Sequence, residues 1–290
     1  MSRVNFLYFT DTVTMNRAEA NDSQLFDAIF SGDKFKVKEL VGYGVDKNAV
    51  IHSPARWEGA TVLGAAACLG HIEIVQYLLE EGAPVNFRDP CTGRSALHWA
   101  IVGDQYQMCK LLIKHGADIN SEDKENVTPL LRATIGRKLD IVKLIITNGA
   151  DINWRDSLQC SPLHYACVHG DPALVDLIVK GGCVQNSKVI IGKGTPLASL
   201  VHHNDAESIG LLLDAGYDLS NELWLNHHMN TNIKSDNFTQ LLKHCQRNPR
   251  RLNTCCRYVI RQQMGGVSVQ KKINSLNIPQ RLKSYLLLET

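Results

Sequence analysis

Acidic residues are nearly absent from the C-terminal part of this 290-residue chain. Residues 241–290 contain ten Lys and Arg but a single acid, Glu289, whereas residues 1–240 contain 21 Lys and Arg against 28 Asp and Glu. The two parts therefore carry net charges of +9 and −7. Such a division predicts two segments that have different partners.

Long apolar runs and paired cysteines are also lacking. No apolar run approaches the ~18 residues that a membrane-spanning helix needs, so we expect no membrane partner. The apolar patch near the N-terminus is broken by Asp11 and does not match a secretory signal. The nine cysteines form no C-x-x-C pair, and Cys68, Cys109 and Cys167 fall inside helical patterns. These absences favour a reduced cytoplasmic protein that binds no metal, with nuclear presence also open.

The central part of the chain repeats with a period of 33 or 34 residues. Leucines recur at Leu63, Leu97, Leu130, Leu163 and Leu197, and glycines at Gly82, Gly116, Gly149, Gly182 and Gly216. A Thr-Pro or Ser-Pro pair opens several units, because the hydroxyl caps a helix and Pro suits its first turn. An alanine-rich helix, a tight turn and a second apolar helix that ends at the glycine follow. The A-D-I-N segment is then expected to run in an extended form.

One such unit cannot bury its own apolar face, so the units must stack. The period and the T-P-L-H element resemble the ankyrin repeat. The resemblance predicts an all-α repeat protein, with an ankyrin-repeat solenoid of about six repeats over residues 22–220. Residues 1–21 would form an N-terminal extension, and residues 221–247 a capping and linker segment. In ankyrin arrays the histidine of T-P-L-H, here His98 and His164, is a structural residue that hydrogen-bonds between loops.

A different pattern begins at Asn248. This residue and the proline after it predict a helix start, and the pair Gly265-Gly266 predicts its end. The apolar residues between them fall at i, i+3, i+4, i+7 and i+8, on one helix face: Leu252, Cys255, Cys256, Val259 and Ile260. The sequence LNIPQRLKSYLLLE then predicts another helix that starts at Pro279. By itself, the apolar face would also suit a helix that closes the repeat stack.

The order of these elements resembles a SOCS box over residues 248–290, which would be a small helical domain. In that family the first element binds Elongin C, which associates with Elongin B. The resemblance implies that Leu252 and Cys256 enter a pocket of Elongin C, with Ile260 beside them. A thiol is small and polarisable, so it suits a tight apolar pocket. Arg251 departs from the family pattern, because Ser, Thr or Pro is preferred there.

The downstream element resembles the family's cullin-binding motif, and the usual cullin is cullin-5 with its RING protein. The candidate cullin-binding residues are Leu276, Ile278 and Pro279. Asn277 stands where the first Pro of the motif is usual, and Ile278 replaces a Leu. These departures affect the cullin assignment more than the Elongin assignment.

The ankyrin resemblance also implies where a substrate protein binds, because loop tips and first-helix faces form a binding wall in that family. Repeat phase alone places these candidate substrate-binding residues on the wall: Arg94, Lys124, Glu125, Ile135, Leu158, His169 and His202. Their mix of apolar and charged types suits a protein partner better than a small ligand. Trp99 and Tyr165 stand where the family has a core leucine, and interior packing is expected there. No nucleophile–base set or phosphate-binding loop occurs, so no catalytic residue and no cofactor are predicted.

Together the two modules are identified as belonging to the ankyrin repeat and SOCS box family. This implies a non-catalytic substrate-recognition subunit of an Elongin B/C–cullin–RING ubiquitin ligase that promotes degradation of an unknown target. Two alternatives stay open. The chain could be an ankyrin scaffold whose tail caps the array, or its basic tail could bind nucleic acid. The tail has only Tyr258 and Tyr285 as aromatic residues, which disfavours the second alternative, so no nucleic-acid partner is predicted.

Overall fold

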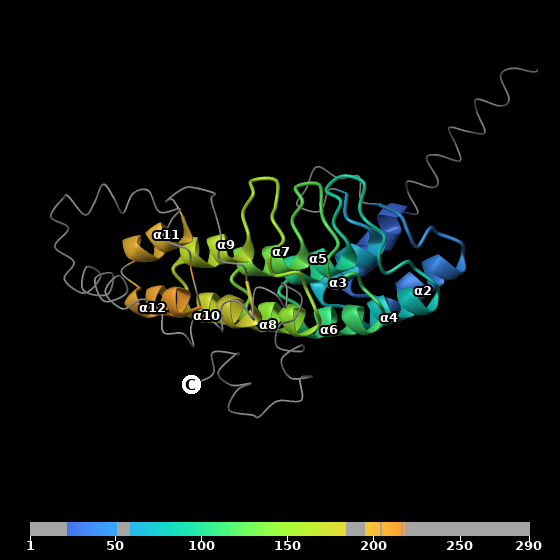
Figure 1. Cartoon of the computed structure of the whole chain (residues 1–290). Coiled ribbons are helices and arrows are strands. Elements are labelled where there is room, and N and C mark those ends of the chain that lie inside the picture. Colours follow the sequence, from blue (N-terminus) through green and yellow to red (C-terminus); the bar gives the residue numbers. More distant parts are fainter. Residues whose placement is uncertain (1–21, 51–58, 184–194, 204, 216, 218–290) are drawn as a thin grey trace, which may run out of the picture. The chain divides into compact units, whose positions relative to one another are not determined.

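The computed structural model of the chain describes residues 22–50, 59–183, 195–203, 205–215 and 217 (Figure 1). These residues belong to two compact units, which divide between positions 124 and 125. Each unit consists of pairs of short helices joined by loops. The predicted terminal extension, capping segment and SOCS box lie outside the described residues, and their boundaries remain predictions.

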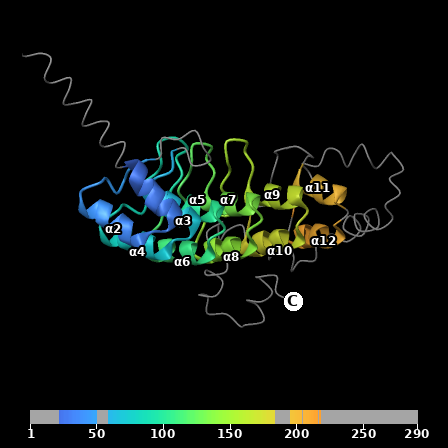
Figure 2. The ribbon, with the colours of Figure 1, turned by 180° about the vertical axis from the view of Figure 1, so that it is seen from behind.

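Unit 1 contains three helix pairs within its described part. After a helix at residues 22–31 come α2 (Lys34–Gly42), α3 (Val62–Leu69), α4 (Ile72–Glu80), α5 (Ala96–Val102) and α6 (Tyr106–Lys114). Helices α3 and α5 contact each other, as do α2 and α4 (Figures 1 and 2). The first helices of the pairs therefore pack on one another, and the second helices form a separate layer.

Unit 2 repeats this arrangement within its described part. Its helices are α7 (Pro129–Ile135), α8 (Leu139–Thr147), α9 (Pro162–His169), α10 (Pro172–Gly181), α11 (Pro196–His202) and α12 (Ala206–Asp214). Helix α9 contacts α7 and α11, whereas α10 contacts α8 and α12. Figure 2 shows the same two layers from behind. The prediction of an all-α repeat protein is confirmed for the described residues.

The predicted helix starts are confirmed by the cap geometry. The hydroxyl of Thr61 accepts a hydrogen bond from Gly64 N at 2.9 Å, and that of Thr128 accepts one from Leu131 N at 3.4 Å. Pro occupies the first turn of α7, α9, α10 and α11. After the second helix of one repeat, α8, Gly149 has a φ of 98°, a left-handed conformation that favours glycine.

The expectation that the A-D-I-N segments are extended is wrong. Each forms a turn, because the Asp side chain accepts a hydrogen bond from the backbone two residues later. The distance is 2.9 Å from Asn120 N to Asp118 Oδ1, and also 2.9 Å from Asn153 N to Asp151 Oδ1. Each segment therefore redirects the chain into the next loop.

The core lies between the helices of each unit. In α3 the side chains of Ala65, Ala66 and Ala67 are fully buried, and their small size lets neighbouring helices approach closely. Cys68, Cys109 and Cys167, which fall inside the helical patterns of the sequence, are buried and form no disulfide bond. Burial raises the pKa of the Cys109 thiol to about 12. These cysteines therefore act as small apolar residues.

Candidate target-binding surface

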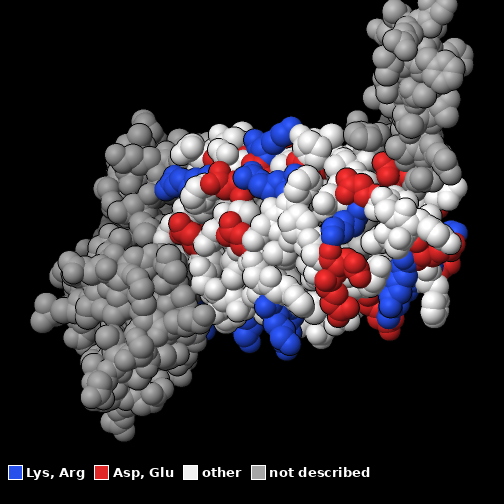
Figure 3. Space-filling view, turned by 90° about the vertical axis from the view of Figure 1, so that its right-hand side faces the viewer, with Lys and Arg blue, Asp and Glu red and all other residues white. Residues whose placement is uncertain are grey.

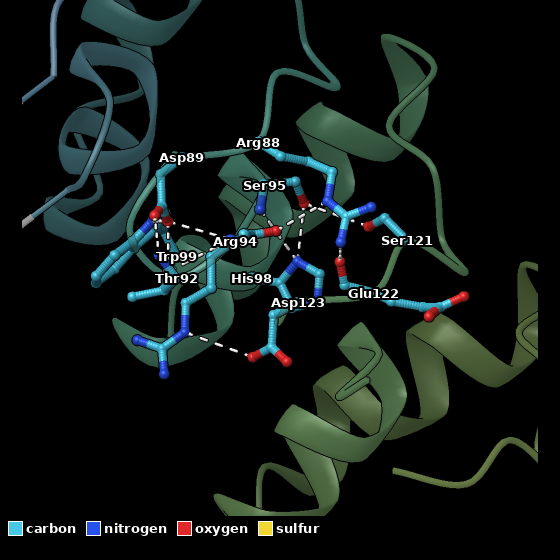
Figure 4. Close-up of polar contacts among 11 residues, drawn as sticks. Arg88, Asp89, Thr92, Arg94, Ser95, His98, Trp99, Ser121, Glu122 and Asp123 are labelled. Carbon is cyan, nitrogen blue, oxygen red and sulfur yellow. Dashed lines mark hydrogen bonds and ion pairs between the residues drawn. The ribbon is translucent and has the colours of Figure 1, made fainter. Parts of the chain in front are cut away.

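Two neighbouring loops of unit 1 are tied together by hydrogen bonds. Lys124 donates from its backbone nitrogen to Thr92 O at 2.8 Å and from its ammonium group to Pro90 O at 2.5 Å. Arg88 on the first loop donates from its guanidinium to Glu122 O on the second (Figure 4). The candidate substrate-binding residue Lys124 is therefore already engaged in holding the loops to one another.

Arg94, another candidate substrate-binding residue, lies over the ring of Trp99. Its guanidinium carbon is 5.2 Å from the ring centroid, within the range of a cation–π interaction. Its Nε atom lies 3.7 Å from Asp123 Oδ2, and the Arg94 side chain is 23% exposed (Figure 4). Arg94 can thus contact a partner only through the remaining open part of its guanidinium.

Asp89 is the central acceptor of the first loop. Its carboxylate is buried and accepts hydrogen bonds from Thr92 N and Thr92 Oγ1, both at 2.5 Å, and from Arg94 N at 3.1 Å (Figure 4). Trp99 Nε1 on α5 donates to it at 3.2 Å. Since a buried carboxylate needs several donors, this loop has few alternative conformations.

The T-P-L-H histidines serve the helix starts. Ser95 N donates to His98 Nδ1 at 3.2 Å, and Ser161 N donates to His164 Nδ1 at 3.1 Å. Both rings are buried, and each also lies within hydrogen-bond distance of its serine hydroxyl. These bonds stabilise the helix starts, whereas the hydrogen bond between loops that the family resemblance implies stays a prediction.

In unit 2 the loop over residues 156–160 carries the candidate residue Leu158. The Leu158 side chain is 65% exposed, although the loop backbone is strongly hydrogen-bonded. Asp156 Oδ1 accepts hydrogen bonds from Leu158 N at 3.0 Å and from Cys160 N at 2.8 Å. Ser157 N donates to the carbonyl of Glu125, an exposed candidate residue, at 3.0 Å. Leu158 is thus displayed on an ordered turn.

The other candidate residues of unit 2 lie at the C-terminal ends of its first helices. Ile135 ends α7, His169 ends α9 and His202 ends α11. The His202 ring makes an edge contact with His203 at 5.7 Å, and His203 Nε2 lies 3.0 Å from Val168 O. Of these three residues, His202 is exposed, whereas Ile135 and His169 are half-buried.

The environment of His169 disfavours its protonation. Burial first, and then the positive charge of Arg137, lower the pKa of His169 below its usual value. Arg137 itself forms an ion pair with Asp171, with 3.2 Å between Nη2 and Oδ2. His169 therefore presents a neutral imidazole near neutral pH.

Three buried aspartates in the loops of the two units are absent from the sequence-based prediction. Asp89, Asp123 and Asp156 are 2–3% exposed and are spaced by 34 and 33 residues, which is the period of the repeat. The same period could have identified them. Their burial and their donors, however, appear only in the folded loops.

Trp99 and Tyr165 were predicted to pack in the interior. Trp99 is buried, in agreement, whereas Tyr165 is half-buried. Both use a polar atom as well: the Tyr165 hydroxyl donates to Asp156 Oδ2 at 2.5 Å, as Trp99 Nε1 donates to Asp89. Their role therefore extends beyond filling space.

Both signs of charge are interspersed over the face of the described residues seen in Figure 3. Within the residues that the structure describes, no group of three or more His, Cys, Asp or Glu could hold a metal ion. No helix among them is both long and apolar enough to cross a membrane. The arrangement of ordered loops and exposed helix ends suits the binding of another protein.

The predicted adaptor-binding positions cannot be placed in the same way. Leu252, Cys256 and Ile260 lie outside the described residues, as do the candidate cullin-binding residues Leu276, Ile278 and Pro279. Their assignment depends on the sequence and on the comparisons with known families.

Comparison with known families agrees with this architecture. Ankyrin repeats match residues 25–123 and 116–189, which together are more than half of the chain. The described fold and loops are thus those of an ankyrin-repeat protein. A SOCS box matches residues 248–287. The chain belongs to the ankyrin repeat and SOCS box protein family.

Individual relatives match only parts of the chain. Ankyrin repeat and SOCS box protein 6 of Mus musculus is 45% identical over 74 residues, or 25% of this chain and 18% of the relative. The Homo sapiens protein of that name is 43% identical over 74 residues, with the same shares. Diacylglycerol kinase iota of Rattus norvegicus is 30% identical over 123 residues, or 42% of this chain and 11% of the relative. The chain thus matches less than a fifth of the length of these relatives.

Proposed function

We propose that this protein is the substrate-recognition subunit of a ubiquitin ligase. The ankyrin units would bind a target protein, and the SOCS box would bind Elongin C, with Elongin B, and a cullin that carries a RING protein. The observation that carries the proposal is the occurrence of both modules in one chain, with the SOCS box match at residues 248–287. The protein would perform no chemistry of its own.

The adaptor interface would centre on Leu252 and Cys256, with Ile260 beside them. Their spacing of four residues would place them one turn apart on one face of a helix, where they could enter a single apolar pocket. Burial of one leucine or isoleucine side chain stabilises a complex by roughly 1.5–3 kcal/mol. A few such buried residues can supply most of the binding free energy of a protein–protein interface.

Leu276, Ile278 and Pro279 would contact the cullin, and cullin-5 is the cullin we propose. Asn277 and Ile278 depart from the usual motif of the family, so the cullin contact needs a test of its own. Binding of purified cullin-5 to the complex of this chain with Elongin B/C measures it directly. Failure to bind cullin-5, with the Elongin complex intact, would assign the chain to a different cullin.

The catalytic contribution of the chain would be proximity. A target that is held beside the ubiquitin-charged conjugating enzyme reacts as if it were at a high effective concentration. The target surface would consist of the ordered loops and helix ends of each unit. We further propose a cytoplasmic location, with a nuclear location as the alternative, and fractionation of cells that express the full chain distinguishes the two.

The test compares the full chain with the double variant Leu252→Ala, Cys256→Ala. We expect wild type to co-purify with Elongin B/C and the double variant to lose it, since it lacks two side chains that would be buried in the complex. Thr254→Ala, a small substitution outside the predicted apolar face, is the control and should retain binding. Absence of Elongin B/C from the wild-type complex would leave an ankyrin scaffold as the function.

A second measurement addresses the target. Proteins labelled by a proximity enzyme on the full chain are compared with and without a proteasome inhibitor. A true target should accumulate with the inhibitor and be ubiquitinated by the reconstituted complex. The same target should not be ubiquitinated when the double variant replaces wild type.

A further inference from the structure

Each unit contains a loop whose buried carboxylate is bonded to an aromatic side chain of the following helix. In unit 1, Trp99 Nε1 donates to Asp89 at 3.2 Å, and in unit 2 the Tyr165 hydroxyl donates to Asp156 at 2.5 Å. Both carboxylates are 2% exposed. Trp99 and Tyr165 thus occupy the same position of the repeat in the two units, and each donates a hydrogen bond to a buried aspartate.

The other hydrogen bonds of these carboxylates go to the loop backbone. Asp89 accepts from Thr92 N and Arg94 N, and Asp156 accepts from the backbone nitrogens at the tip and end of its own loop. A continuous chain of bonds therefore runs from helix α5 or α9 through a carboxylate to the loop tip. Burial and the Asp156 bond raise the pKa of Tyr165, so its hydroxyl stays a donor at neutral pH.

In unit 2 this hydrogen-bonded loop exposes an apolar side chain to solvent. Leu158 is 65% exposed, between the exposed uncharged residues Ser157 and Gln159. Gln159 has a φ of 63°, a left-handed conformation that costs free energy for a non-glycine residue. Of the two charged residues that precede it in the chain, Arg155 is half-buried and Asp156 is buried. The tip is therefore uncharged and apolar at its centre.

We propose that Tyr165 and Asp156 are positioning residues that hold the loop over residues 156–160 in its binding conformation. The loop presents Leu158 as an anchor for an uncharged apolar pocket on a folded target protein. A preordered loop loses less conformational entropy on binding, and one central apolar anchor can dominate a contact. The claim about loop order stands by itself, whereas the claim about the target rests on the proposed function.

The order of the loop is tested by amide hydrogen exchange on the full chain. Tyr165→Phe removes only the hydroxyl and should accelerate exchange of the Leu158 and Cys160 amides about fivefold, the loss expected for one hydrogen bond. Amides within α9 should be unchanged. Tyr165→Trp supplies an N–H donor, as Trp99 does in unit 1, and should restore slow exchange. Tyr106→Phe, at an exposed tyrosine on α6, is the control for loss of a tyrosine hydroxyl elsewhere.

Two outcomes of this experiment would overturn the positioning role. Equal acceleration throughout α9 and α10 would mean that Tyr165 stabilises the whole unit and not the loop. No acceleration in Tyr165→Phe would mean that its hydroxyl does not order the loop at all. Acceleration confined to the Leu158 and Cys160 amides, with rescue by Tyr165→Trp, supports the proposal.

Target binding is then measured with the purified protein that the reconstituted ligase ubiquitinates. Leu158→Ser should weaken binding about tenfold, and Tyr165→Phe should raise the dissociation rate more than it changes the association rate. Both variants should still bind Elongin B/C. Loss of Elongin B/C binding would therefore count against the proposed function, and unchanged target binding against the apolar anchor. Unchanged affinity of Leu158→Ser, or affinity that falls steeply with salt, would exclude the apolar anchor in favour of a charged contact.

Discussion

The close approach of α3 and α5 can be tested with one methyl group. In unit 1, Gly103 caps the C-terminus of α5 with a φ of −75°, a conformation that alanine adopts without strain. A Cβ atom there would nevertheless collide with the backbone of Cys68 at the end of α3, since it would lie 2.8 Å from the carbonyl carbon and even closer to the carbonyl oxygen. Backbone atoms cannot rotate away, so the two helices would have to separate.

This geometry sets the expected magnitude for Gly103→Ala. Forcing extra atoms into a packed interface costs about 1–3 kcal/mol, and a collision with backbone belongs near the upper end. For a domain of this size the melting temperature should fall by roughly 5–10 °C. Thermal unfolding of the full chain, followed by far-ultraviolet circular dichroism, measures the change in the midpoint temperature.

The repeat provides a matched control one period later. Gly136 caps α7 of unit 2 with a φ of −77°, but its nearest neighbours outside the helix backbone include the flexible Lys138 side chain at 3.3 Å. Gly136→Ala should therefore be neutral or stabilise by up to about 1 kcal/mol. Equal midpoints for the two alanine variants would refute the argument that α3 and α5 touch through their backbones at this point.

Further predictions concern pH, strain and thiol reactivity. Folding lowers the pKa of His169, so the stability of the protein should be highest above pH 6.5, the usual pKa of histidine, and should fall as the pH decreases through the pKa of the folded state. His169→Gln should reduce this fall, which a series of melting curves at different pH values measures. Arg137 has a φ of 55°, so Arg137→Gly should unfold at a higher urea concentration than Arg137→Ala, although both variants lose the exposed ion pair with Asp171. Iodoacetamide at pH 8 should modify the exposed Cys91 quickly and the buried Cys109 slowly, because burial raises the pKa of the latter to about 12; mass spectrometry showing equal rates would contradict this burial.

The loops show the limit of what the repeat pattern could predict. The period placed Arg94 and Lys124 on a candidate binding wall, and the structure shows both engaged within the loops of unit 1. Leu158 was placed by the same reasoning and is exposed at a loop tip. The position of a residue within the repeat specifies which side of the repeat it occupies, but not whether its charged group is already bonded to a neighbouring loop.

The sequence by itself determined the features of this protein that depend on local chemistry. Thr and Ser caps, Pro in the first helical turn and Gly after the second helix act through bonds within a few residues, so the period and the helix pairs could be read directly. Tertiary structure alone decided the buried partners of Asp89 and Asp156 and the contact of Gly103 with Cys68. Asp89 meets Trp99 and Asp156 meets Tyr165, ten and nine residues along the chain, only when each loop folds against the helix that follows it. Gly103 meets Cys68, 35 residues away, only when the folded repeats stack.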